Sequence, residues 1–130
     1  MLLQTTLCLA AAAAVINLWL GMRISRVRMS AKILHGDGGN EGLMRRMRAQ
    51  ANFVENVPLA LILIGAIELS TKGGQWLAVV GGLFMLARLA HALGMDSTRP
   101  NALRAGGTLV TMLTLLGLAV VAILIATGRF

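Results

Sequence analysis

Two stretches of this 130-residue chain contain no charged residue: residues 1–22 and residues 105–128. Each stretch is at least as long as the roughly 20 residues with which an apolar α-helix crosses a bilayer. Only 13% of all residues are charged, against about 25% in a typical soluble domain. We therefore expect an integral membrane protein, and the composition argues against a soluble enzyme, a disordered tail or a disulfide scaffold.

The hydropathy pattern predicts an all-α fold, a single four-helix membrane domain over residues 1–130. We expect the spans at about 2–22, 49–69, 75–95 and 105–127. The flanks of the 23–48 connector look helical, so the first two helices should project beyond the bilayer. Basic residues follow the first apolar run instead of preceding it, which favours a retained span over a secretory signal.

The twelve basic residues are distributed unequally between the predicted connectors. Nine lie in the first and third connectors, two lie on the opposite side, and Arg88 lies within a span. This asymmetry predicts that the first and third connectors are cytoplasmic and that both termini are outside. The net charge of +7 is thus mainly a signal of topology, and a chain without Tyr offers no stacking surface typical of nucleic-acid binding.

Three isolated residues have structural interpretations. Cys8 has no partner for a disulfide or a CxxC motif, and we expect a buried packing thiol. Asn17 lies on a face of small residues, where an amide can form a hydrogen bond between helices. Glu68 precedes Lys72 by four residues, which indicates a surface pair without a function.

The most informative residues are polar groups within the predicted spans, because ionisable groups at membrane depth are costly unless paired or solvated. Arg48, Asn52 and Glu55 follow a spacing that places them on one helix face. Glu55 and Arg88 are each expected roughly 10 Å below the cytoplasmic edge. We therefore predict an intramembrane ion pair between Glu55 and Arg88, with His91 one turn nearer the cytoplasm. Such a pair could simply lock the second and third helices together.

Arginines at the rim of a pocket and a deeper glutamate suit a zwitterionic ligand with several carboxylates and one ammonium group. Arginine binds carboxylates in a forked geometry, and Glu55 would accept the ammonium. Glutathione has this charge pattern, and a nearby arginine would lower the pKa of its thiol. Composition alone does not select glutathione among anionic ligands, and nothing in the sequence indicates a metal.

Residues 48–58, RAQANFVENVP, resemble the RAxxNxxExxP signature of the MAPEG family, the membrane-associated proteins of eicosanoid and glutathione metabolism. The GDGG turn at 36–39 and RLAHALG at 88–94 resemble the bacterial branch of that family. Four spans in about 130 residues agree with it, so the resemblance covers essentially the whole chain.

This resemblance implies a homotrimer in the bacterial inner membrane, surrounded by lipid, with glutathione bound between subunits near the cytoplasmic face. It also implies transfer of glutathione to lipophilic electrophiles, or reduction of lipid hydroperoxides, with glutathione as the co-substrate. Carried over by position, Arg48, Asn52 and Glu55 match the glutathione-binding motif, Gln50 matches a further contact, and Arg23 or Arg26 matches an arginine at the end of the first helix. Arg104 matches the arginine that activates the thiol, and His91, at a position of a family tyrosine, is the second catalytic candidate.

The chain departs from the family in having no tyrosine. Asn56, His91 and Met95 stand where many relatives have one, and His91 could act as a hydrogen-bond donor or a base instead. The loss of tyrosine favours an alternative, a non-catalytic membrane scaffold that binds lipid or glutathione. A small cation or drug transporter is a further alternative, but Arg88 at matched depth would keep Glu55 charged and prevent proton exchange.

Overall fold

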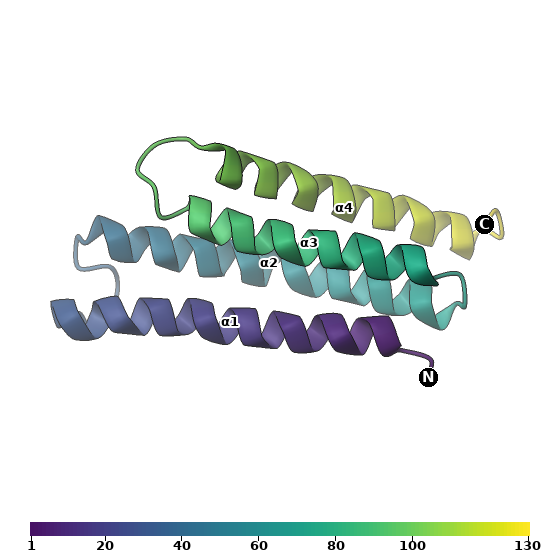
Figure 1. The fold of residues 1–130 in the computed structure, drawn as a ribbon, viewed down its shortest axis with the longest axis horizontal. Coiled ribbons are helices and arrows are strands. Elements are labelled where there is room, and N and C mark those ends of the chain that lie inside the picture. The colour runs from purple at the N-terminus through teal and green to yellow at the C-terminus, as the bar shows by residue number, and fades with distance from the viewer.

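The computed structural model describes all 130 residues and contains four helices and no strand (Figure 1). The helices are α1 Gln4–Ala31, α2 Glu41–Leu69, α3 Gln75–Gly94 and α4 Ala102–Ala126. Each is long and apolar enough to cross a membrane. The predicted all-α four-helix fold is therefore confirmed, and α1 and α2 extend well past the predicted spans, as their helical flanks indicated.

Local sequence explains where the helices at the connectors begin and end. Asn40 precedes α2, and its side chain accepts a hydrogen bond from the backbone N–H of Leu43 at 2.9 Å. Asn101 caps α4 in the same way, accepting from the N–H of Arg104 at 2.9 Å. Both contacts satisfy an N–H group that the first helical turn leaves free. Gly38 and Gly39 adopt positive φ angles in the connector between α1 and α2, where glycine is favoured.

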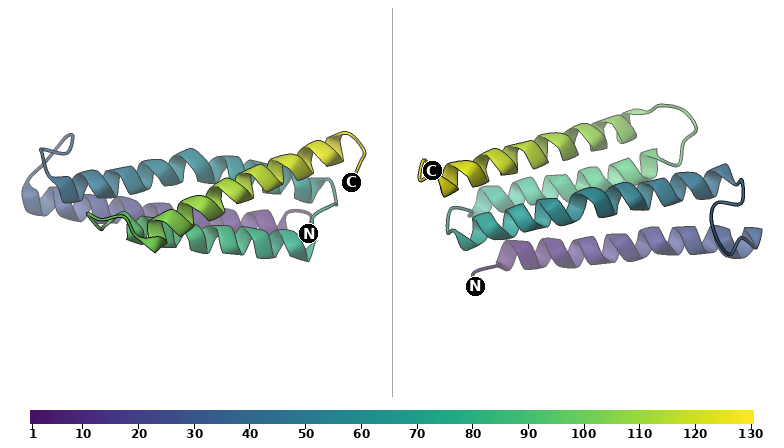
Figure 2. Two further views of the ribbon diagram at one scale, coloured as in Figure 1. Left: turned by 90° about the horizontal axis from the view of Figure 1, so that it is seen from above. Right: turned by 180° about the vertical axis from the view of Figure 1, so that it is seen from behind.

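The helices form a bundle in which α1 and α4 lie on opposite sides of the α2–α3 pair (Figures 1 and 2). No contact joins α1 to α4, whereas all other helix pairs touch. The connectors 32–40 and 95–101 lie together at one end, which we call the connector end. Residues 70–74 and both termini lie at the other end, which we call the terminal end.

The core is apolar, and so is much of the outer surface. Leu20, Phe53, Ile64 and Phe84 are buried between helices. In contrast, α4 buries only Gly107, Thr111 and Leu118 and leaves large apolar side chains exposed along its length. An apolar exterior is expected of helices that face hydrocarbon.

Glycines allow α3 and α4 to approach closely at the connector end. A Cβ atom added to Gly107 would lie 2.6 Å from Cβ of His91 and 2.7 Å from the carbonyl oxygen of Ala87. A Cβ atom added to Gly94 would clash with the backbone nitrogen of Arg104. Small residues commonly permit such contacts between membrane helices. They place the start of α4 directly against the last turns of α3.

Two of the sequence predictions at the terminal end are wrong. Cys8 is exposed, because the next residue, Leu9, turns toward Gly81 of α3. Glu68 does not pair with Lys72; its carboxylate accepts from the backbone N–H groups of Thr5 and Thr6, both at 2.8 Å, and from the Thr6 hydroxyl at 2.6 Å. Because α1 has no side-chain cap of its own, its N-terminus is a better partner for the carboxylate than an exposed lysine.

Candidate functional site

The signature residues of α2 share one helix face, which we call the motif face and define by Arg48, Asn52 and Glu55. Arg48 and Glu55 are exposed, and Asn52 is half-buried. The opposite side of α2 supplies core residues, including Phe53 and Val57. Neither Arg48 nor Glu55 takes part in the ion pairs of the chain, which join Arg23 to Asp96 and Arg45 to Glu41. The motif face therefore presents one unpaired cation and one unpaired anion.

The predicted ion pair between Glu55 and Arg88 is wrong. Arg88 is 1% exposed, and its Nη2 group donates to Oδ1 of Asn52 instead. Glu55 lies three residues further along α2, which turns its side chain by about 60° relative to Asn52. Glu55 and Arg88 were matched by their depth along the helix axes alone, without this rotation. It is Asn52 that faces α3.

Arg88 also connects to α4, through a residue that the sequence analysis missed. Its Nη1 group donates to the hydroxyl of Thr111 at 3.0 Å, and this hydroxyl donates to the carbonyl of Gly107 at 2.8 Å. A possible signal was the spacing of Thr108, Thr111 and Thr114, every third residue in an otherwise apolar span. Asn52, Arg88 and Thr111 form a polar network across α2, α3 and α4 in which Arg88 has no carboxylate partner.

The two predicted catalytic residues lie in different environments. His91 is 3% exposed, and its Nδ1 atom has no hydrogen-bond partner. Arg104 is exposed at the start of α4, where it lines a groove of about 590 Å³ together with Asn101 and Thr108. In the single chain, Arg104 is accessible to a ligand and His91 is not.

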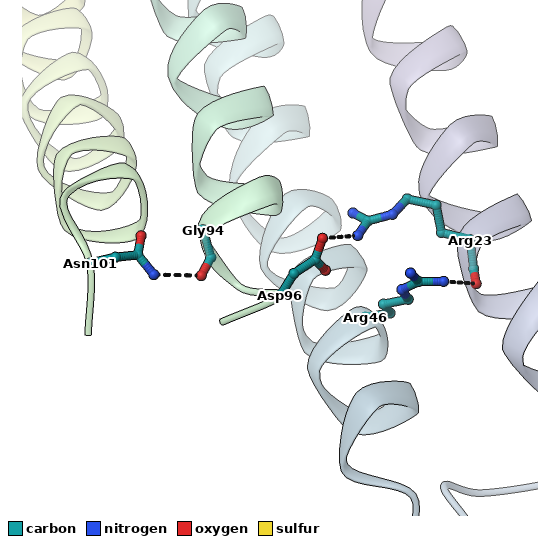
Figure 3. Close-up of polar contacts among 5 residues, drawn as sticks. All are labelled: Arg23, Arg46, Gly94, Asp96 and Asn101. Carbon is teal, nitrogen blue, oxygen red and sulfur yellow. Dashed lines mark hydrogen bonds and ion pairs between the residues drawn. The ribbon is translucent and has the colours of Figure 1, made fainter. Parts of the chain in front are cut away.

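Arg23 is engaged within the chain, whereas Arg26 is exposed. The Arg23 guanidinium pairs with Asp96 of the third connector (Figure 3). It also lies 4.8 Å from the centre of the Trp19 ring. Arg46 donates to the backbone carbonyl of Arg23 at 3.0 Å. Because Nη1 of Arg23 is buried without a partner, only part of its donor capacity is used.

The third connector is thereby tied to the bundle on both sides. Asp96 holds it to α1, and Asn101 donates to the carbonyl of Gly94 at 2.8 Å (Figure 3). Asp96 is not among the residues predicted from the sequence, although it is the only acidic residue of that connector. Its isolated negative charge among basic residues was the available signal.

Gln50, a predicted ligand contact, forms a hydrogen bond inside the chain. Its Nε2 group donates to Oδ1 of Asn17 at 3.3 Å, which joins α1 to α2 and confirms the interhelical role predicted for Asn17. Gln50 also lines a cavity of about 320 Å³ with Arg28 and Val54. The side chain thus stabilises the helix pair and borders a small opening between α1 and α2.

The fold and the motif face define a four-span membrane protein with a charged face on its second helix. The model of the MAPEG family matches residues 6–124, and the chain belongs to this family. Inner membrane protein YecN of Escherichia coli strain K12 is 34% identical over 86 residues, which covers 62% of this chain. YecN of Escherichia coli O6:H1 strain CFT073 gives the same values. The chain spans 65% of the length of these relatives, slightly less than two thirds.

Proposed function

We propose that this chain is a glutathione-binding protein of the bacterial inner membrane. The observation that carries the proposal is the pair of opposite, exposed and unpaired charges of Arg48 and Glu55 on the motif face. Membership of the MAPEG family supports it, as does the name of the related YecN, an inner membrane protein.

The spacing of the two charges suits a tripeptide. Arg48 and Glu55 are seven residues apart, or about 10 Å along the helix. Three extended residues also span about 10 Å. Arg48 would bind a carboxylate of glutathione through charge-assisted hydrogen bonds, and Glu55 would bind its ammonium group. Asn52, between them, would contact the middle of the ligand.

The exposure of the motif face also supports assembly. Charged groups that face hydrocarbon are costly, so Arg48 and Glu55 need a polar partner outside their own chain. We propose that a second copy covers this face in a homotrimer and that glutathione binds between the copies. The excess of basic residues at the connector end supports a site on the cytoplasmic side.

Arg104 is the side chain best suited to activate the thiol, since its guanidinium is accessible and has no partner in the chain. A cation lowers the pKa of a thiol and favours the thiolate. In the transferase reaction the thiolate attacks an aryl carbon; the C–S bond forms, the C–halide bond breaks and halide leaves. In the peroxidase reaction the thiolate attacks a hydroperoxide oxygen and releases an alcohol, and a second glutathione converts the resulting sulfenic acid to a disulfide and water.

The proposal is tested by glutathione-dependent turnover of an aryl halide and of a lipid hydroperoxide by the purified protein. We expect Arg104→Ala to lower kcat and Arg48→Ala to raise KM for glutathione. Arg99→Ala, which removes an exposed arginine of the third connector, is the control and should change neither. Absence of turnover with either substrate would contradict the catalytic part.

A non-catalytic protein that binds glutathione or lipid is the second candidate. The absence of tyrosine and the burial of His91 favour it, because Arg104 is then the only accessible one of the two predicted catalytic side chains. Tight binding of glutathione without turnover of either substrate would support this alternative.

Transport of small cations is a weaker candidate. Arg88 does not hold Glu55, which removes one argument against it. However, α1 contains no acidic residue. Uptake into proteoliposomes that disappears in Glu55→Gln would support transport.

A further inference from the structure

The orientation of the Asn52 amide follows from the groups around it. Arginine has only hydrogen-bond donors, so the atom of Asn52 that faces Arg88 must be the carbonyl oxygen, Oδ1. Nδ2 of Asn56 lies 3.4 Å from the same oxygen and donates to the backbone carbonyl of Asn52 at 2.8 Å. Two donors from two helices therefore converge on one side of the amide.

The other side of the amide is free. No hydrogen bond within the chain uses Nδ2 of Asn52, whose two N–H groups lie on a half-buried side chain. The neighbours on the motif face, Arg48 and Glu55, are exposed. The only unused hydrogen-bonding capacity of this side chain is that of a donor, close to the two unpaired charges.

Arg88 is positioned to hold this orientation firmly. It is 1% exposed, and its side-chain acceptors are Oδ1 of Asn52 and the hydroxyl of Thr111. A buried guanidinium without a counter-ion needs every neutral acceptor that it has, because unmade hydrogen bonds of a buried charge are costly. Rotating the amide of Asn52 by 180° would place its N–H groups against the guanidinium and leave Nη2 without an acceptor.

We infer that Arg88 is a positioning residue. It fixes the amide of Asn52 in the orientation in which Nδ2 donates to the ligand, so this position selects a hydrogen-bond acceptor of the ligand. This inference rests on the proposed binding of glutathione and names the ligand group involved: a carboxylate or peptide carbonyl oxygen lies at Asn52. An ammonium or amide N–H group of the ligand is excluded from this position.

The substitution Asn52→Asp tests this inference with almost no change of shape. The new carboxylate gains an ion pair with Arg88 but has no N–H group for the ligand. We expect the melting temperature of the detergent-solubilised protein to stay the same or rise. We also expect affinity for glutathione, measured by isothermal titration calorimetry, to fall about tenfold or more.

Three further variants separate positioning from a structural role. Arg88→Met removes the donors that fix Asn52 and should also weaken glutathione binding, whereas Arg88→Lys, which retains a donor, should restore part of it. Thr111→Val is the matched control, because it removes the other acceptor of Arg88 but keeps its contact with Asn52. It should lower the melting temperature with little change in the dissociation constant.

Each outcome separates this inference from the proposed function. Unchanged affinity in Asn52→Asp, with wild-type binding intact, would overturn the inference and leave the proposed function standing. If the wild-type protein does not bind glutathione, the proposed function and the ligand half of the inference both fail. In that case the melting temperature tests whether Arg88 positions Asn52. A clear fall in the melting temperature of Asn52→Asp would overturn this part of the inference. An unchanged melting temperature, or a rise that the added substitution Arg88→Met abolishes, would support it.

Discussion

Polar side chains lie in apolar helices at both ends of the bundle, but the two ends differ in how many of these polar groups have a partner within the chain. At the terminal end, Glu68 accepts three hydrogen bonds from the first turn of α1. At the connector end, nitrogen atoms of Arg23, Arg88 and His91 are buried without partners. Arg48 and Glu55 on the motif face carry charges that nothing in the chain neutralises.

This difference separates polar groups that stabilise the fold from those available to another molecule. A carboxylate whose hydrogen bonds are all made within the chain has a structural role, and no ligand is needed to account for its position. Unused donors and unpaired charges are costly in a membrane protein, so they indicate a ligand or a neighbouring copy. Substitutions at the terminal end should therefore change stability, and substitutions on the motif face should change binding.

The largest effect on stability is expected at the close contact of α3 and α4. Gly107→Ala would place a methyl group 2.6 Å from Cβ of His91 and 2.7 Å from the carbonyl of Ala87, so the helices must separate. We expect a loss of about 3 kcal/mol. Its neighbour Gly106 has no atom within 4 Å of an added Cβ, and Gly106→Ala should stabilise the helix by about 0.5–1 kcal/mol. Tryptophan fluorescence during denaturation in detergent measures both; equal effects would contradict the close packing.

A smaller loss is expected at the terminal end. Glu68→Ala removes the carboxylate that caps α1 and should cost about 2 kcal/mol in the same unfolding measurement. Glutathione binding should be unchanged, because Glu68 lies at the end opposite the connectors. Glu41→Ala, which removes an exposed carboxylate 3.8 Å from Arg45, should change stability by no more than about 0.5 kcal/mol. A marked loss of binding in Glu68→Ala would remove the distinction between the two ends.

A loss smaller than that of Glu68→Ala is expected at the ion pair of the third connector. Asp96→Asn removes the counter-ion of Arg23 but leaves a hydrogen-bond acceptor of the same shape. Because Asp96 is 39% exposed, water can partly replace the lost interaction, and we expect a cost of about 1 kcal/mol. A cost above that of Glu68→Ala would show that the connector end is held together mainly by this pair.

The sequence was sufficient to predict what depends on distance along the chain. The charge-free stretches located α1 and α4, the hydropathy pattern located α2 and α3, and the spacing of Arg48, Asn52 and Glu55 correctly placed them on one face. It could not predict what depends on the rotation of one helix against another. Depth alone matched Glu55 with Arg88, but rotation about the axis of α2 brings Asn52 to Arg88 instead.

The remaining errors have a related cause: tertiary neighbours compete with partners nearby in sequence. Glu68 has Lys72 four residues away, yet it bonds to α1, more than sixty residues distant. Arg23 pairs with Asp96 across a separation of 73 residues. A single sequence gives no sign of either contact. Periodic patterns come from several residues at a regular spacing, whereas each of these contacts joins one residue to one distant residue.

The central claim is that the motif face binds glutathione, and titration of glutathione into the purified protein in lipid nanodiscs tests it most directly. We expect saturable binding by the wild-type protein and by Glu41→Gln, which neutralises another exposed carboxylate of α2. Glu55→Gln should weaken binding about tenfold or more, because the ligand ammonium loses its counter-ion, while its stability changes by less than about 0.5 kcal/mol. Absence of binding by the wild-type protein, or equal affinity in Glu55→Gln, would contradict the account.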